Sequence, residues 1–486
     1  MSKRLSFIDK MRGLGRRGSN LPSGRSAHAA GMARQPGPGA QLFAPAVLPL
    51  SLFVIASALL GGGPGGWSAG FALWSVIALV MLVATGLTGG FGTFGRLPLI
   101  ARVAMLGWVA LPFLQLLPLP PGVWQALPGG ELRLAVMREF GMASSWMPLS
   151  MSPGDTAYTA AVAIVMMVAL LAMLRLSGPQ FRVLCWLLVG LVGLGAAIGV
   201  IQYGSTGTTL QFYRHAHRAS LIGFFANKNH MGLVLACMIP MLYALVLSRP
   251  KKSGAASSNA SFALVSIAFL IMALIIATNS RAALGLGLLA LLAALVRSFP
   301  DRRLHLVGGA VAAAAVVALL IAFVPTIGSL FDRFGATGEY ERLDILARAW
   351  PVMTEYWRMG AGFGTFAIIY NPTEALSNVA PPYLNQMHND WLELVVEGGV
   401  PMILLQLCSI AAVIAGLAGY WRLSQGRART SEEVLLAWAG LIIVLLFGLH
   451  SIVDYPGRRI ASLLVLMFGL AMVFRPLVGA GRAKAD

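Results

Sequence analysis

The sequence contains few charged residues and few cysteines. Lys, Arg, Asp and Glu make up 11% of its 486 residues, whereas a soluble globular domain carries about 25%. The three cysteines (Cys185, Cys237 and Cys408) lie singly within apolar runs, so no disulfide framework or C-x-x-C metal pair can be recognised. Because 57% of the residues are hydrophobic, we expect an all-α polytopic membrane protein.

The first 41 residues form a basic segment interrupted by Gly, Ser and Pro, which lacks the apolar mass to fold alone. A signal peptide would place a short apolar core near residue 10, but the first apolar run begins near Leu42 and is of full length. We therefore interpret residues 1–41 as a disordered cytoplasmic tail before an uncleaved anchor. A transmembrane domain follows over 42–476, and residues 477–486 form a second cytoplasmic tail.

Apolar runs long enough to cross a bilayer recur along this domain, since one helical span needs about 20 apolar residues. Asn279, Ser280 and Arg281 interrupt a stretch that is too long for one span, so a tight reversal is expected there. The sequence thus predicts about twelve spans: 42–62, 67–86, 98–117, 156–174, 182–203, 230–247, 260–279, 281–297, 304–325, 396–417, 435–450 and 460–474.

The charge distribution predicts the orientation. With twelve spans and a cytoplasmic N-terminus, the inside segments are the two tails, 87–97, 175–181, 248–259, 298–303 and 418–434. Together with the adjoining span ends they hold 24 of the 36 Lys and Arg residues but 5 of the 18 Asp and Glu residues. Since positive residues stay inside, both termini are predicted to be cytoplasmic. The net charge of +18 then faces anionic lipid, and no nucleic acid partner is needed.

Two outside segments are longer than ordinary hairpins, about 118–155 and 326–395. The second, between spans nine and ten, contains apolar residues at helical spacing, which predicts an amphipathic helix with Arg342 a quarter turn from the stripe. The stripe consists of Leu343, Leu346, Trp350, Met353 and Trp357. The glycine-rich run at 360–366 has no G-K-[ST] ending and no preceding strand, so it predicts a tight turn rather than a phosphate loop.

A histidine and three carboxylates follow at the outer mouth of span ten. Asn389 or Asp390 can cap the helix, and Asp390, Glu393 and Glu397 then share one face beside His388. Titratable groups at membrane depth are costly and default to a functional role, and a neutral histidine can take a proton from a hydroxyl. A helix-capping cluster at the interface is the structural alternative.

Further basic and histidine clusters end on the same side of the membrane. Arg281 lies where two spans meet, and Arg458 and Arg459 follow span eleven. An H-x-H zinc site at His215 and His217 would have only two ligands, which do not make a site. Convergent Arg, Lys and His suit an anionic lipid-linked substrate, with arginine binding a diphosphate. The substrate-binding candidates are Arg218, Asn227, Lys228, His230, Asn389, His450 and Asp454.

Three stretches resemble the superfamily of O-antigen ligases and Wzy-type O-antigen or exopolysaccharide polymerases. They are Thr278–Ala283, the loop from Arg342 to Phe366, and His388-Asn389 followed by Gly399, which is similar to the family's H-[NSQ]-x9-G signature. The resemblance covers roughly 200–460. This chain has Met402 and Ala282 where the family often has glycine, which leaves the subfamily open.

The resemblance implies a GT-C-like fold and a metal-independent glycosyltransferase without cofactor, in the bacterial inner membrane with its site facing the periplasm. The donor and acceptor would be undecaprenyl-diphosphate-linked oligosaccharides, and a chain-length regulator would be a partner. By that analogy His388 would activate the acceptor hydroxyl, while Arg281 and Arg342 would hold the donor diphosphate. A repeat-unit polymerase is the leading expectation. The alternatives are a ligase that transfers glycan to lipid A-core, a protein O-oligosaccharyltransferase, and a lipid-linked glycan flippase or transporter.

Overall fold

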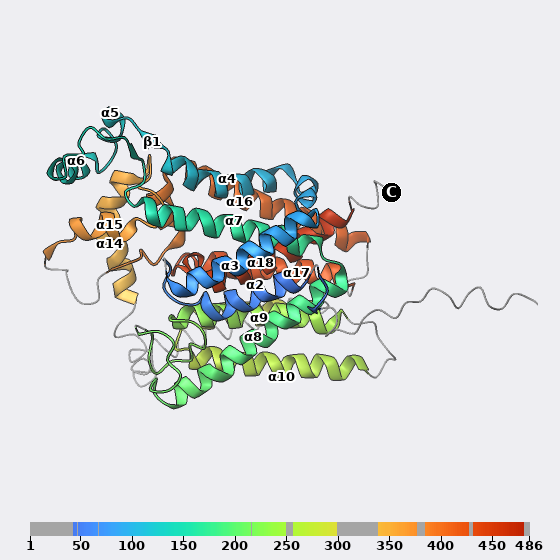
Figure 1. Cartoon of the computed structure of the whole chain (residues 1–486). Coiled ribbons are helices and arrows are strands. Elements are labelled where there is room, and N and C mark those ends of the chain that lie inside the picture. Colours follow the sequence, from blue (N-terminus) through green and yellow to red (C-terminus); the bar gives the residue numbers. More distant parts are fainter. Residues whose placement is uncertain are drawn as a thin grey trace, which may run out of the picture.

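The computed structural model describes residues 42–45, 47–66, 68–214, 216–248, 256–298, 339–376, 384–426 and 431–480. Within them the chain forms an α-helical bundle with a smaller group of helices at one end (Figure 1). The two strands, β1 (Pro118–Leu119) and β2 (Met147–Pro148), pair antiparallel in that outer group. The all-α prediction is therefore confirmed.

Among the described residues, nine helices are long and apolar enough to cross a membrane. Helix α2 (Leu48–Leu60) and the apolar part of α10 (Ala256–Ala277) are shorter candidates. These eleven helices correspond to eleven of the twelve predicted spans, and the span at 304–325 lies outside the described residues, so the number twelve stays a prediction. The nine are α3 (Ala69–Leu87), α4 (Leu99–Leu116), α7 (Pro153–Arg175), α8 (Gly178–Gly204), α9 (Lys228–Leu247), α11 (Arg281–Ser298), α16 (Asp390–Gly426), α17 (Glu432–His450) and α18 (Ile460–Ala480).

Helix α9 forms the centre of the bundle, where every residue from Asn229 to Met241 is buried. It packs against α11 through Gly232, where an added Cβ would lie 2.3 Å from the Cβ of Ala283. Helices α17 and α18 approach each other in the same way at Gly440, whose Cβ would lie 2.5 Å from the Gly469 carbonyl oxygen. Small residues at such crossings let helix backbones pack closely, as membrane helices commonly do.

The predicted reversal between α10 and α11 is present. Asn279 adopts a positive φ of 55°, a conformation that asparagine tolerates better than most residues. Its side-chain amide donates to the carbonyl oxygen of Ala219, 3.2 Å away. Ser280 then caps α11, because its hydroxyl accepts from the Ala283 amide at 3.2 Å.

The outer group contains α5 (Pro121–Trp124), α6 (Gly130–Glu139), α14 (Glu339–Tyr356) and α15 (Phe366–Tyr370) (Figure 1). Helix α14 confirms the helix predicted in the long outer loop, but its buried side differs from the predicted stripe. Trp350 and Trp357 are 60% and 39% exposed. Ile345, Ala349, Val352 and Tyr356 form the buried side instead, because the short helix α15 and the start of α16 cover that side.

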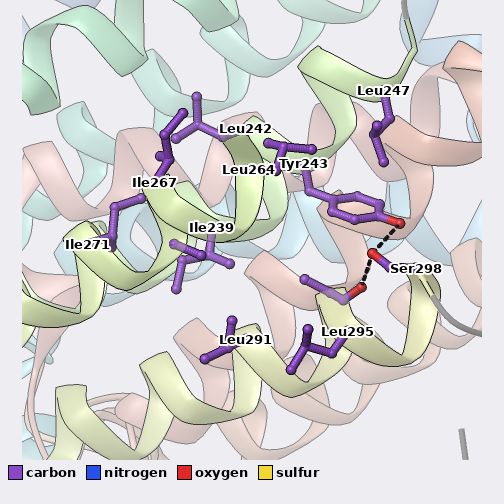
Figure 2. A pocket seen from close by; sticks show the side chains of 12 residues that line it. Ile239, Leu242, Tyr243, Leu247, Leu264, Ile267, Ile271, Leu291, Leu295 and Ser298 are labelled. Atoms are coloured by element: carbon purple, nitrogen blue, oxygen red, sulfur yellow. Dashed lines mark hydrogen bonds between the residues drawn. The ribbon is translucent and has the colours of Figure 1, made fainter. Parts of the chain in front are cut away.

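Several chain segments meet where α9, α11, α16 and α18 begin, and we call this the site end of the bundle. Hydrogen bonds join Ala226 to Gly62, and Leu221 to Ala277. The opposite end contains an apolar groove between α9, α10 and α11 (Figure 2), where Ser298 hydrogen-bonds to Tyr243. This groove lies away from the residues singled out in the sequence.

Candidate functional site

A kink in α16 shapes the site end. Gly399 has φ 66° and ψ −158°, and Pro401 lacks the N–H that would continue the helix. The carbonyl oxygens freed by the kink are bonded by other segments: Ala361 N donates to Val396 O at 3.1 Å, and Gly362 N donates to Glu397 O at 2.9 Å. The glycine-rich run at 360–366 is therefore a tight turn, as predicted, and it completes the hydrogen bonds of a broken helix.

The two segments approach so closely that neither tolerates a side chain at the contact. A Cβ on Gly399 would lie 2.6 Å from the Arg358 carbonyl oxygen, and one on Gly360 would lie 2.4 Å from the Glu397 carbonyl oxygen. The signature glycine at 399 thus has a steric reason, because its φ and its neighbours both exclude other residues.

The three carboxylates at the start of α16 surround Arg458. Distances from its guanidinium nitrogens are 3.6 Å to Asp390, 3.2 Å to Glu393 and 2.7 Å to Glu397. Backbone amides bond the same carboxylates, since Met387 N donates to Glu393 and Gly457 N to Asp390. Burial lowers the pKa of Arg458, but the three carboxylates outweigh that effect and raise it. This cluster fixes the segments before and after Arg458 to the start of α16.

The expected grouping of these carboxylates with His388 is thus not what the structure shows. Helical spacing correctly placed Asp390, Glu393 and Glu397 on one face, but that face is covered by Arg458. The carboxylate near His388 is Asp454, whose Oδ1 lies 3.7 Å from His388 Nδ1. The contact joins two distant parts of the chain, so spacing within one helix could not predict it.

Asp454 lies at the centre of three histidines. Besides His388, His230 Nε2 lies 3.6 Å from Asp454 Oδ1, and His450 Nε2 lies 4.0 Å from Oδ2. Asn229 donates to Oδ2 and the Tyr455 amide donates to Oδ1. Burial raises the pKa of Asp454, but the nearby His230 and the charges of the three histidines lower it well below its ordinary value. Asp454 is therefore held as a buried carboxylate.

His388 is the histidine of this group that reaches solvent. Its side chain is 25% exposed, whereas those of His230, His450 and Asp454 are fully buried. Its backbone has a positive φ of 55°, and its ring meets the Tyr455 ring edge-on with centroids 4.8 Å apart. A sparsely populated backbone conformation at a partly exposed histidine that faces a carboxylate is typical of functional sites.

The remaining predicted residues lie around this group. Asn227 caps α9 by accepting from the Asn229 amide at 2.9 Å, and Asn389 caps α16 by accepting from the Leu392 amide at 3.0 Å. Lys228 and Arg281 are half-buried first residues of α9 and α11, and Arg218 is exposed. Arg342 lies in α14, with its side chain outside the described atoms. Their contact with substrate stays a prediction.

The described part of the chain contains no group of three or more His, Cys, Asp or Glu residues arranged to hold a metal ion. His215 of the H-x-H pair is outside the described residues. His217 is exposed, and its backbone amide donates to Ala226 O at 3.1 Å.

Three residues that contribute to the site were absent from the sequence-based set of site residues: Asn229, Tyr455 and Arg458. Each belongs to a stretch already singled out, but neither periodicity nor spacing distinguishes a residue that supports an aspartate from its neighbours. The excess of three carboxylates within eight residues was a usable signal for Arg458, because buried carboxylates need a cation.

Comparison with known families confirms the resemblance. Residues 266–407 match the family model described as O-antigen ligase. This segment contains His388, Arg281, Arg342 and Gly399, so the chain carries a domain of the O-antigen ligase and Wzy-type superfamily. Members of this superfamily are multi-pass membrane glycosyltransferases that act on lipid-linked glycans. No curated protein matches the chain.

Proposed function

We propose that the protein is a polymerase of glycan repeat units carried on undecaprenyl diphosphate, with its site end on the periplasmic face of the bacterial inner membrane. The observation that carries the proposal is the partly exposed His388, which lies within the matched family segment and faces the buried Asp454 at 3.7 Å. The distribution of Lys and Arg supports the orientation, since the site end then faces outward.

In the proposed reaction His388 acts as the general base. With Nδ1 directed at Asp454, Nε2 would take the proton of the acceptor hydroxyl, and the Asp454 carboxylate would stabilise the resulting imidazolium. The acceptor oxygen then attacks the anomeric carbon of the donor sugar. The carbon–oxygen bond to phosphate breaks, and undecaprenyl diphosphate leaves with the bonding electron pair. The donor is already activated, so no nucleotide is consumed.

In this mechanism four cations would bind the donor diphosphate: Arg281, Arg342, Arg218 and Lys228. The guanidinium groups would pair with phosphate oxygens in a bidentate manner, and the Lys228 ammonium would add a point charge. His230 and His450 are fully buried, so we assign them to the support of Asp454. Asn227 and Asn389 would support the site through their helix caps. A chain-length regulator would act on the same outer face.

The test is the lipid-linked intermediate in a deletion strain, compared with strains complemented by wild type and by His388→Ala. A polymerase predicts single repeat units exposed on the outer leaflet in the deletion and His388→Ala strains. Long, unattached chains would indicate a ligase that transfers glycan to lipid A-core. Single units protected from an enzyme added to spheroplasts would indicate a flippase, and either result would overturn the proposal.

A further inference from the structure

Two consecutive arginines at the site end have opposite surroundings. Arg458 contacts three carboxylates, whereas no carboxylate of the described residues lies within 4 Å of Arg459. Yet Arg459 is 9% exposed. A buried charge is normally paired because the loss of hydration is costly. Its surroundings therefore suit a cation whose counter-ion is a ligand.

The contacts of Arg459 are with a backbone carbonyl and with the side chain of Tyr455. One terminal nitrogen donates to Gly63 O at 3.2 Å, and the guanidinium lies 5.2 Å from the centre of the Tyr455 ring. Burial raises the pKa of the Tyr213 phenol, and the charge of Arg459 opposes that rise. A guanidinium has five N–H donors, so these contacts leave donors for an anion.

The position of Arg459 in the fold does not stabilise its positive charge. It immediately precedes α18, where the partial positive charge of the helix disfavours a cation and favours an anion. Helices α9 and α11 also begin at this end, with Lys228 and Arg281 as their first residues. The three helix starts and three cations raise the positive potential in one region, which is the environment that binds phosphate groups.

Arg459 is also close to His388. The Tyr455 ring contacts both residues, with the His388 ring at 4.8 Å and the Arg459 guanidinium at 5.2 Å from its centre. An anion at Arg459 would therefore lie beside the group that we expect to bind the acceptor hydroxyl. The leaving diphosphate of the proposed donor is such an anion, and in the proposed reaction it would lie close to the acceptor hydroxyl.

We infer that Arg459 is a binding residue for the diphosphate of the lipid-linked donor, next to Tyr455. The inference rests on the proposed function for the identity of the ligand. It adds a cation that lies outside the segment matched by the family model, which ends at residue 407.

The experiment measures binding of geranylgeranyl diphosphate and geranylgeranyl monophosphate to the purified full-length protein in nanodiscs. Arg459→Gln removes the charge but keeps an amide that can donate to Gly63 O. It should weaken diphosphate binding about tenfold or more, since hydrogen bonds to charged groups are the stronger ones. Arg459→Lys should be intermediate. Monophosphate binding should change less.

Arg475→Gln is the matched control. Arg475 also donates to backbone carbonyls, those of Met173 and Leu176, and covers an aromatic ring, that of Phe181, but at the opposite end of α18. It should bind the diphosphate as wild type does. Equal diphosphate affinity in wild type and Arg459→Gln would overturn the inference and leave the proposed function intact. Failure of the wild type to bind diphosphate would also overturn it, while the deletion strain tests the function separately.

Discussion

His388 Nδ1 lies 3.7 Å from Asp454 Oδ1. His388 precedes α16, and Asp454 lies in the loop that precedes α18. The aspartate is fully buried and held by Asn229 and the Tyr455 amide. The backbone of His388 has a positive φ, and its ring is held by contact with the Tyr455 ring. When Nδ1 of a partly exposed histidine faces a fixed carboxylate, one tautomer and one ring orientation are favoured. General-base chemistry requires both.

Asp454→Asn should therefore lower activity by roughly 10²-fold or more, because an amide favours the wrong tautomer of His388. The measurement is polymer formed by purified enzyme on lipid-linked substrate. Asp344→Asn, at an exposed ion pair with Arg348 in α14, is the control and should remain near wild type.

The pH dependence of stability gives a second test of Asp454→Asn. Because the pKa of Asp454 is depressed in the fold, its stabilising contribution is present above the ordinary value of about 3.9 and is lost only as pH falls through its lower folded pKa. The gap in thermal midpoint between wild type and Asp454→Asn should then stay open from pH 8 to pH 5. A gap that closes already near pH 6 would contradict this arrangement.

His388→Ala should abolish detectable polymer while expression and the thermal midpoint stay near wild type, because general-base assistance is worth about 10²–10⁴-fold. His388→Gln should be equally inactive, since an amide cannot take the hydroxyl proton. Substantial activity of His388→Gln would instead indicate a residue that positions the acceptor. Activity and melting, measured on both variants, separate the two roles.

Much of the fold could be predicted from the sequence, because the length and apolar composition of each membrane helix are visible in one continuous stretch. The reversal at Asn279 and the turn at 360–366 were predictable for the same reason. The buried side of α14 was not, since Trp350 and Ile345 differ in exposure only through what packs on the helix.

For the candidate site, the sequence singles out residues that lie together in the fold, but it does not predict their pairings. His388, His230, His450 and Asp454 were all identified from the sequence, and the structure brings them together. Their contacts join three segments of the chain, those around His230, His388 and His450–Asp454. The pairing of Arg458 with Glu393 and Glu397, for example, requires the start of α16 to lie beside the loop before α18, and no local pattern contains that information.

Gly399→Ala should destabilise the protein by roughly 1–3 kcal/mol, the cost of placing a non-glycine residue in such a backbone conformation. The added methyl group would also meet the Arg358 carbonyl oxygen at 2.6 Å. Gly193→Ala, in α8 with no atom within 4 Å of the added group, should not lower the thermal midpoint. Equal midpoints for both variants would show that the kink adapts to a side chain.

Arg281→Lys and Arg342→Lys should each lose most polymer while the protein remains in the membrane. Lysine keeps the charge but lacks the planar fork that binds two phosphate oxygens. The informative measurement is initial rate against donor concentration, compared with Arg297→Lys at the far end of α11. Full activity in both variants would leave these arginines a structural role.

The orientation of the bundle can be tested independently of catalysis. Segments after residues 120, 350 and 455 belong to the end where α9, α11, α16 and α18 begin. The segments predicted from the sequence to be cytoplasmic hold the Lys and Arg excess. Because positive segments are retained in the cytoplasm, alkaline phosphatase fused after residues 120, 350 and 455 should be active. Fusions after residues 255 and 425 should be inactive with phosphatase and active with a cytoplasmic reporter. An inactive phosphatase fusion at 350 would place His388 in the cytoplasm, where the lipid-linked donor chemistry proposed here could not take place.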